Sequence, residues 1–128
     1  MTHWVLIVDD EEMIRENLKA YLEDEGLWVV AFEAVTPALS WLLDGGCCRV
    51  CIMDMRLPDM DGNTAIRTLH RLYPDMKFLI HTGSSSYHLP EDLRAMGLTD
   101  ASVYQKPLGD MAPLAEAARA LALREKQP

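Results

Sequence analysis

The chain has 128 residues, of which 49% are hydrophobic and 25% are charged, a composition typical of one globular domain with a single core. Its formal net charge of −8 argues against nonspecific binding to nucleic acid, because such binding depends on clustered Lys and Arg. No apolar run approaches membrane-spanning length and the amino terminus does not resemble a signal peptide, so we expect a cytoplasmic protein without membrane contact.

Short apolar segments alternate with amphipathic ones along the whole chain. The pattern predicts, in chain order, a strand at 4–8, a helix at 10–26, a strand at 27–33, a helix at 36–46, a strand at 49–54, a helix at 63–73, a strand at 77–82, a helix at 90–97, a strand at 101–105 and a helix at 108–126. Thr36 is the predicted cap of the second helix. Because the strands lack a charged face, we expect a parallel sheet with helices on both sides.

Three cysteines, Cys47, Cys48 and Cys51, lie within five residues of one another. An odd number in so short a stretch is a poor disulfide framework. Cys48 and Cys51 form a C-x-x-C pattern, but it precedes a strand instead of opening a helix, and no second ligand pair is evident for zinc. We therefore expect small buried apolar side chains here, and neither a redox nor a zinc site.

Polar side chains stand at the carboxyl ends of four predicted strands. They are Asp9 and Asp10 after the first strand, Asp54 at the end of the third, Thr82 at the end of the fourth, where the small Gly83 follows, and Lys106 after the fifth. In open α/β sheets, ligands bind outside the carboxyl ends of the strands. The sequence therefore predicts that these side chains converge on one edge of the sheet.

This set of side chains suits phosphoryl chemistry with a divalent cation. Three neighbouring carboxylates repel one another, and at least one pKa rises unless a cation neutralises them. Oxygen ligands in a solvent-facing cleft suit Mg²⁺, while Lys106 and the Thr82 hydroxyl can bind phosphoryl oxygens, with space left beside Gly83. A remaining carboxylate is then free to act as a nucleophile and form an acyl phosphate.

Each residue alone has a simpler interpretation. The acids after the first strand are typical of a helix start, and Thr82 or Lys106 alone is an ordinary strand-end or surface residue. Asp59 and Asp61, in the turn after the third strand, are interpreted as turn formers and not as ligands. The joint occurrence of polar groups at four strand ends favours the functional interpretation.

Four segments, LIVDDEE, IMDMRLPDMDG, IHTGSS and VYQKPL, together resemble the receiver domains of bacterial two-component response regulators. The resemblance covers residues 4 to about 123, leaves 124–128 as a polar tail, and makes residues 1–128 one receiver domain with no effector domain in the chain. It implies a flavodoxin-like three-layer α/β/α sandwich, with five helices around a five-stranded parallel sheet of order 2-1-3-4-5.

The resemblance also implies a role for each matching residue. Asp54 is the implied phosphoacceptor, which takes a phosphoryl group from a sensor histidine kinase, a phosphotransfer protein or a small phosphodonor. The implied cofactor is Mg²⁺, and its implied ligands are Asp10, Asp54, the backbone carbonyl of Arg56 and, largely through water, Asp9. Lys106 is implied to bind phosphate, Thr82 to be the switch hydroxyl, Tyr104 to turn inward when Thr82 moves, and the Lys106–Pro107 bond to be cis.

Other positions modify this pattern. Arg56, Gly83 and Ser84 are candidates for tuning the lifetime of the phosphoryl group. His81 is expected to be a buried structural residue, because alternation points it away from the phosphoryl side.

The last helix is apolar on nearly all sides. It is either a good helix former rich in alanine or, with the fourth helix and fifth strand, a surface for a second copy or an effector.

The leading prediction is a phosphoacceptor signalling module that assists only its own phosphorylation and dephosphorylation and is not an enzyme. Two alternatives stay open: a Mg²⁺-dependent phosphohydrolase with an aspartyl nucleophile, and a docking module that works without phosphorylation. The short chain without an evident substrate cap argues against the first. The complete set of acids, Thr and Lys argues against the second.

Overall fold

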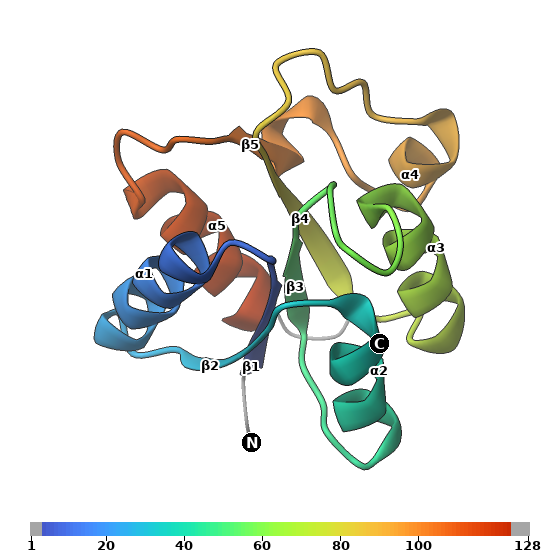
Figure 1. The fold of residues 1–128 in the computed structure, drawn as a ribbon, viewed down its shortest axis with the longest axis horizontal. Coiled ribbons are helices and arrows are strands. Elements are labelled where there is room, and N and C mark those ends of the chain that lie inside the picture. The colour runs from blue at the N-terminus through green and yellow to red at the C-terminus, as the bar shows by residue number, and fades with distance from the viewer. Residues whose placement is uncertain (1–3, 124–128) are drawn as a thin grey trace.

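The computed structural model describes residues 4–123, which form a three-layer α/β/α sandwich (Figure 1). The five strands are parallel and have the order β2-β1-β3-β4-β5, as predicted. They are β1 (Trp4–Val8), β2 (Trp28–Phe32), β3 (Val50–Met53), β4 (Lys77–Thr82) and β5 (Val103–Gln105). The helices are α1 (Glu12–Asp24), α2 (Val35–Leu43), α3 (Gly62–Leu72), α4 (Glu91–Ala95) and α5 (Ala112–Leu123), with a 3₁₀ turn at Asp100–Ser102. The predicted tail at 124–128 lies outside the described residues.

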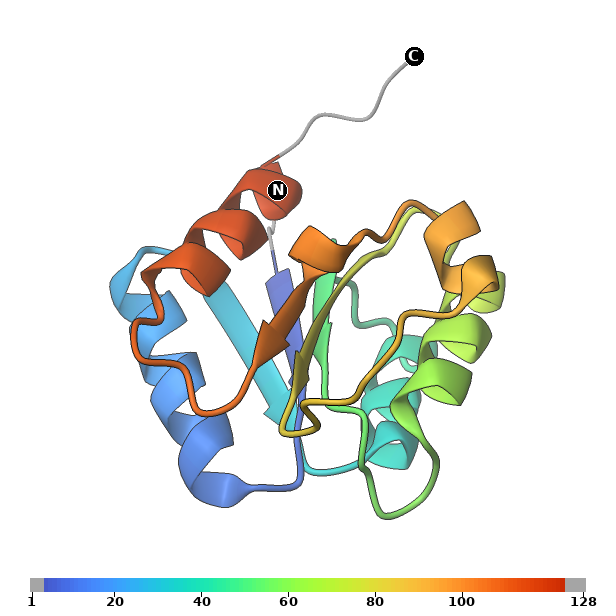
Figure 2. The ribbon, with the colours of Figure 1, turned by 90° about the horizontal axis from the view of Figure 1, so that it is seen from above.

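The sheet separates two apolar cores. Helices α1 and α5 cover one face, and α2, α3 and α4 cover the other (Figure 2). Successive residues of a strand point to opposite faces, so in β1 Val5 and Ile7 pack toward α1 and α5, while Leu6 and Val8 pack toward α2 and α3. Alternate residues of each strand therefore contact different cores. In the part of the chain that is described, no helix is long and apolar enough to span a membrane.

Two acids in the loop between β3 and α3 are helix caps. Asp59 caps α2, because its carboxylate accepts hydrogen bonds from the Val35 N–H at 3.2 Å and from the Thr36 N–H and hydroxyl at 2.7 and 2.6 Å. Helix α2 begins at Val35, so the prediction that Thr36 is its cap was wrong. Asp61 caps α3 by accepting from the Thr64 N–H at 3.0 Å. The interpretation of both acids as simple turn formers is therefore too narrow, since Asp59 ties the loop to α2.

Replacing Asp59 by Ala is expected to lower the free energy of unfolding by about 1–2 kcal/mol, the usual cost of losing a helix cap. Burial of Asp59 slightly opposes ionisation, but the hydrogen bonds from Thr36 and Val35 outweigh it and lower the carboxyl pKa. The stabilisation is therefore present above the pKa of the unfolded carboxyl and is lost as the pH falls through the lowered folded pKa. Urea unfolding at neutral and acid pH measures both effects. Glu33→Ala, at an exposed acid before the same helix, is the control, and an equal loss there would contradict the cap.

The last helix begins later than predicted, at Ala112 and not at residue 108. Leu108 and Met111 precede it in an irregular segment and still pack against the core under α1 and α5. The helix buries Leu114 and Ala118 but leaves Leu123 52% exposed, so one side faces solvent. The end of the predicted helix, at 124–126, lies outside the described residues.

The three cysteines differ in their surroundings. Cys51 is buried and Cys48 is half-buried, where burial raises the pKa of its thiol to about 12. Cys47 is exposed, so the prediction of small buried side chains was wrong for this residue. Within residues 4–123, the one cluster of possible metal-ligating side chains contains no cysteine.

All three tryptophans of the chain gather at the amino-terminal end of the strands. The rings of Trp4 and Trp28 meet edge-on with centroids 5.2 Å apart, and Trp41 lies 6.3 Å from Trp4. Such edge-to-face contacts are favourable between aromatic rings. This tryptophan cluster (Trp4, Trp28 and Trp41) therefore fastens β1, β2 and α2 together at the end of the sheet opposite the carboxyl ends of the strands.

Candidate functional site

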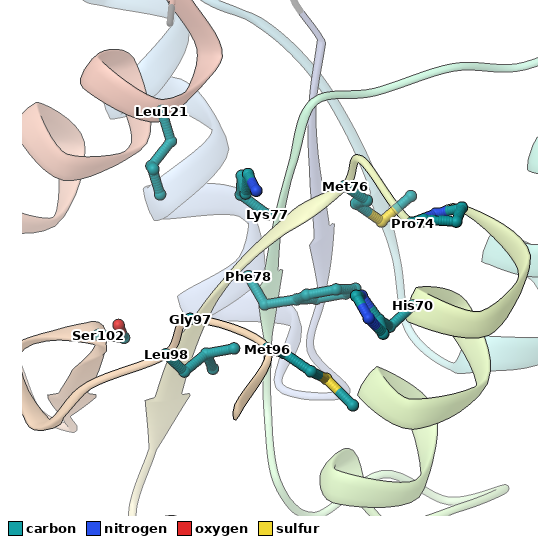
Figure 3. A pocket seen from close by; sticks show the side chains of 10 residues that line it. All are labelled: His70, Pro74, Met76, Lys77, Phe78, Met96, Gly97, Leu98, Ser102 and Leu121. Carbon is teal, nitrogen blue, oxygen red and sulfur yellow. The ribbon is translucent and has the colours of Figure 1, made fainter. Parts of the chain in front are cut away.

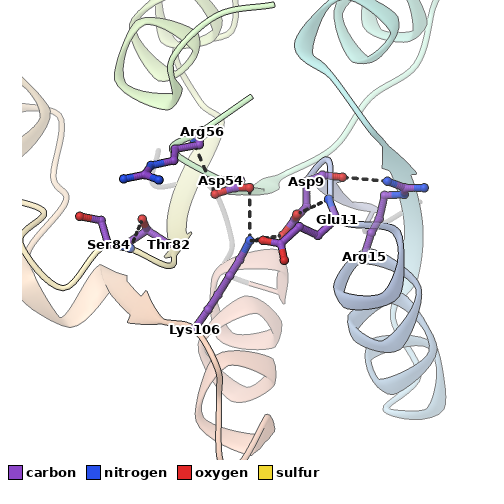
Figure 4. Close-up of polar contacts among 8 residues, drawn as sticks. All are labelled: Asp9, Glu11, Arg15, Asp54, Arg56, Thr82, Ser84 and Lys106. Carbon is purple, nitrogen blue, oxygen red and sulfur yellow. Dashed lines mark hydrogen bonds and ion pairs between the residues drawn. The ribbon is translucent and has the colours of Figure 1, made fainter. Parts of the chain in front are cut away.

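The predicted polar side chains gather where the carboxyl ends of β1, β3, β4 and β5 meet (Figure 4). Asp54 directly follows β3, and its N–H donates a 3.0 Å hydrogen bond to the Val8 carbonyl at the end of β1. The Lys106 N–H donates to the Thr82 carbonyl at 2.8 Å in the same way. Main-chain hydrogen bonds that continue the pairing of the strands therefore hold Asp54 and Lys106 at the carboxyl ends of the sheet.

One ammonium group holds three carboxylates together. The Lys106 Nζ lies 2.9 Å from Asp9 Oδ2, 2.9 Å from Glu11 Oε1 and 3.2 Å from Asp54 Oδ2 (Figure 4). The side chains of Lys106, Asp9 and Asp54 are 7%, 3% and 5% exposed, whereas that of Glu11 is 57% exposed. The cluster thus has a buried interior and one solvent-facing member.

The charges of this cluster are not balanced. Burial and the charge of Asp9 raise the pKa of Asp54 from 3.8 to about 6, although Lys106 partly offsets the rise. Burial alone would lower the pKa of Lys106, but its hydrogen bonds with Glu11 and Asp9 outweigh burial and raise it. The single positive charge of Lys106 cannot neutralise the three neighbouring carboxylates, so a further cation would be stabilised here.

The carboxylates fit a hard divalent cation. Asp9, Asp10, Glu11 and Asp54 each offer an oxygen atom, and these oxygens all lie within 4.8 Å of one another. Oxygen-only ligands at a partly exposed position are the set that Mg²⁺ prefers. Glu11 is a member that the sequence pattern does not single out. Its backbone N–H donates to Asp9 Oδ1 at 2.9 Å, so the chain folds back and brings Glu11 beside Asp9.

The loop after β3 packs closely around Asp54. The Arg56 N–H points to Asp54 Oδ1 at 3.4 Å, and the backbones of Arg56 and Asp61 form an isolated antiparallel β-bridge across the turn. Gly62 lies against this turn, where a Cβ atom would press on the Asp54 carbonyl oxygen and on Met55. The absence of a side chain at Gly62 therefore allows the loop to close beneath Asp54.

Thr82 is buried at the end of β4, with its hydroxyl beside the following loop. Its Oγ1 accepts a hydrogen bond from the Ser84 N–H at 3.1 Å. A Cβ at Gly83 would meet no atom within 4 Å, so the space predicted beside this glycine is present. The Lys106–Pro107 peptide bond is cis, as predicted.

Tyr104 is not brought to Thr82. The register pairs Tyr104 with His81, and Thr82 with Gln105. Tyr104 packs on the core under α1 and α5, whereas Val103 packs on the opposite core, which contains Ile80 of β4. By strand alternation Thr82 shares the face of Ile80, so the arrangement does not support the predicted coupling of Thr82 to Tyr104.

His81 is 4% exposed, in agreement with its prediction as a buried residue, and burial lowers its pKa.

Tyr87, in the loop between β4 and α4, is a contact that the sequence does not reveal. Its hydroxyl donates a 2.6 Å hydrogen bond to Asn63 Oδ1 in the first turn of α3. Its ring is half-buried against the core under α3 and α4. This hydrogen bond therefore connects the loop between β4 and α4 to the start of α3.

A shallow hollow of about 140 Å³ lies at the other end of β4 (Figure 3). Its lining residues include Phe78, Met76, Met96, His70 and Lys77. None of its lining residues is a carboxylate, and it lies at the amino-terminal end of the strand, away from Asp54. The carboxylate cluster at the carboxyl ends is thus the candidate site.

Comparison with known proteins points in the same direction. Residues 5–118 match the family described as the response regulator receiver domain. The transcriptional regulatory protein FixJ of Azorhizobium caulinodans is 31% identical over 116 residues, which cover 87% of this chain and 51% of FixJ. The sensor kinase CckA of Brucella abortus is 30% identical over 95 residues, which cover 70% of this chain and 10% of CckA. The chain thus spans about half of FixJ and about a tenth of CckA.

Solved structures share the fold. The response regulator TrrA of Thermotoga maritima, crystallised in complex with Mg²⁺–BeF, superposes with a TM-score of 0.78 at 27% identity, covering 94% of this chain and 99% of TrrA. The non-phosphorylated receiver domain of HemR from Leptospira biflexa also gives a TM-score of 0.78, at 25% identity, covering 99% of this chain and all of that domain (100%).

Proposed function

The chain belongs to the response regulator receiver domain family, a family of regulatory phosphoacceptor modules of two-component signalling, and from this premise we propose that Asp54 accepts a phosphoryl group from a histidine kinase or phosphotransfer protein. The observation that carries the proposal is the position of Asp54. It is a buried carboxylate 3.2 Å from the Lys106 ammonium, among further acids that fit a divalent cation.

The proposed chemistry needs no proton removal. The Asp54 carboxyl, with a pKa of about 6, is largely ionised at neutral pH and attacks the phosphorus of the donor. A bond from phosphorus to an Asp54 oxygen forms, the bond to the donor nitrogen or oxygen breaks, and its electron pair leaves with the donor. Lys106 neutralises charge on the phosphoryl oxygens. Mg²⁺ would be held by Asp10, Asp54 and the Arg56 carbonyl, with Asp9 through water, and would neutralise the remaining phosphoryl charge.

The response to phosphorylation is proposed to start at Thr82. Its hydroxyl lies at the end of β4 beside a loop that Tyr87 fastens to α3, and this loop leads to α4. Tyr104 lies on the opposite face of the sheet, so we assign it no part in this first step. Arg56, Gly83 and Ser84 border Asp54 and Thr82 and are proposed to tune the phosphoryl lifetime.

The extent of the domain and its contact surface complete the proposal. Residues 1–128 are proposed to form one receiver domain, with the output supplied by a partner or by chain outside this sequence. The face made by α4, β5 and α5 is the proposed contact for an effector or a second copy. It carries the exposed ion pair of Arg94 with Asp100, at 2.6 Å.

Incubation with Mg²⁺ and acetyl phosphate, followed by intact mass spectrometry, tests the proposal. The wild type is expected to gain one labile phosphoryl group, and Asp54→Ala is expected to gain none. No gain by the wild type, or an equal gain by the variant, would overturn the assignment. Multiple turnover of p-nitrophenyl phosphate would instead favour a phosphohydrolase, and partner binding unaffected by Asp54→Ala would favour phosphorylation-independent docking.

A further inference from the structure

The Lys106 ammonium has no donor to spare in this structure. A lysine side chain has three N–H bonds, and three carboxylates lie within 3.2 Å of its nitrogen: Asp9, Glu11 and Asp54. A phosphoryl oxygen on Asp54 needs one of these N–H groups. The phosphoryl group can take over the N–H that faced Asp54, and any second phosphoryl contact must displace Asp9 or Glu11 from Lys106.

The burial of each carboxylate indicates which of them gives up its contact with Lys106. Asp9 is 3% exposed, so separating it from the ammonium would leave a buried charge without its partner, which is costly. Asp54 exchanges its own contact with Lys106 for one through the phosphoryl group that it carries, so Asp9 and Glu11 are the carboxylates that compete with the phosphoryl oxygens for the ammonium. Glu11 is 57% exposed, and water can solvate its carboxylate as soon as the contact breaks. Glu11 is thus the partner that loses least by releasing Lys106.

We propose that Glu11 is a positioning residue that holds Lys106 in its resting place and competes with the phosphoryl oxygen for it. This inference rests on the proposed phosphorylation of Asp54 and adds a resting-state partner for the lysine. Breaking the Lys106–Glu11 contact is part of the cost of phosphorylation. Removal of the Glu11 carboxylate should therefore speed phosphoryl acceptance.

Three variants separate this role from a general charge effect. Glu11→Gln removes the charge and the ionic contact. Glu11→Asp keeps the charge but shortens the side chain by one methylene, so that the 2.9 Å contact with Lys106 is lost. Glu12→Gln removes the same charge from the neighbouring exposed residue. A positioning role predicts that Glu11→Asp behaves like Glu11→Gln, whereas a charge effect predicts that it behaves like the wild type.

Two measurements decide the outcome. With acetyl phosphate and Mg²⁺, Glu11→Gln and Glu11→Asp are expected to acquire the phosphoryl group about two- to fivefold faster than the wild type, as release of a surface ion pair implies. Glu12→Gln is expected to stay close to the wild type. Without any donor, the NMR signal of the Lys106 ammonium is expected to shift, and its protons to exchange faster, in both Glu11 variants only.

Wild-type rates in Glu11→Asp, or equal acceleration in Glu12→Gln, would overturn the proposal in favour of a charge effect. A loss of Mg²⁺ affinity in Glu11→Gln at least tenfold greater than in Glu12→Gln, measured by calorimetry, would make Glu11 a metal ligand and overturn it as well. The failure of the proposed function is distinguishable, because the wild type would then gain no phosphoryl group. The ammonium signal would still report whether Glu11 holds Lys106.

Discussion

Asp54→Asn is expected to unfold at a higher temperature than the wild type at pH 7.5 in the absence of metal, although it lacks the proposed phosphoacceptor. Ionised Asp54 is buried beside Asp9, and this raises its pKa from 3.8 to about 6. The neutral amide removes that repulsion and leaves Lys106 with Asp9 and Glu11. We expect a gain of about 1–3 kcal/mol in the free energy of unfolding, since one pKa unit corresponds to about 1.4 kcal/mol.

The sign of the pH dependence follows from the raised pKa. A carboxyl with a raised folded pKa binds its proton more tightly in the folded state, so its favourable contribution is complete below the unfolded pKa and is lost as the pH rises through about 6. The advantage of Asp54→Asn is therefore large at pH 7.5 and small near pH 4.

Thermal unfolding in EDTA across this pH range measures the effect. Glu116→Gln, at an exposed acid in α5, is the control and should track the wild type. An Asp54→Asn variant that is less stable than the wild type at pH 7.5 would show that the contact with Lys106 outweighs the repulsion. The expected result would show that this site is built for chemistry at a cost in stability.

Gly62→Ala is expected to lower the free energy of unfolding by about 2–3 kcal/mol and to slow phosphoryl acceptance at the same time. Its Cβ would press on the backbone oxygen of Asp54 and on Met55, and backbone atoms cannot rotate away as a flexible side chain can. Relief of the clash must shift the loop or the Asp54 backbone. The same methyl group therefore strains the fold and moves Asp54, the proposed nucleophile.

Urea unfolding and acetyl phosphate kinetics together test this prediction. Gly109→Ala is the matched control, because a Cβ there would meet no atom within 4 Å. If Gly62→Ala is as stable as the control, the close approach beneath Asp54 is not needed. If it is destabilised but accepts the phosphoryl group at the wild-type rate, the loop has yielded without moving Asp54.

The sequence pattern predicts the alternation of strands and helices and the carboxylate edge well, because both depend on local features, whereas the sheet order was implied by the resemblance to receiver domains. Strand β1 is apolar throughout and is followed directly by Asp9, and strand β3 is likewise apolar and followed directly by Asp54. The pattern fails where two distant segments meet. Asp59 caps a helix that begins 24 residues earlier, and no local signal announces this contact.

The same limit explains the outcome for Tyr104. Alternation says that neighbouring residues of β5 face opposite sides, but only the pairing with β4 shows that Tyr104 lies beside His81. Glu11 illustrates a different limit. An acid before a helix is well explained by the helix alone, so its contact with Lys106, 95 residues away, is invisible in the sequence.

The tryptophan cluster decides what the intrinsic fluorescence of this protein can report. Every indole of the chain lies at the amino-terminal end of the strands, and Asp54 lies at their carboxyl ends. Emission should therefore follow unfolding of the whole sheet and remain almost silent when a cation or a phosphoryl group binds. An optical binding assay needs a new fluorophore near α4, while the native emission serves as an internal standard for the folded fraction.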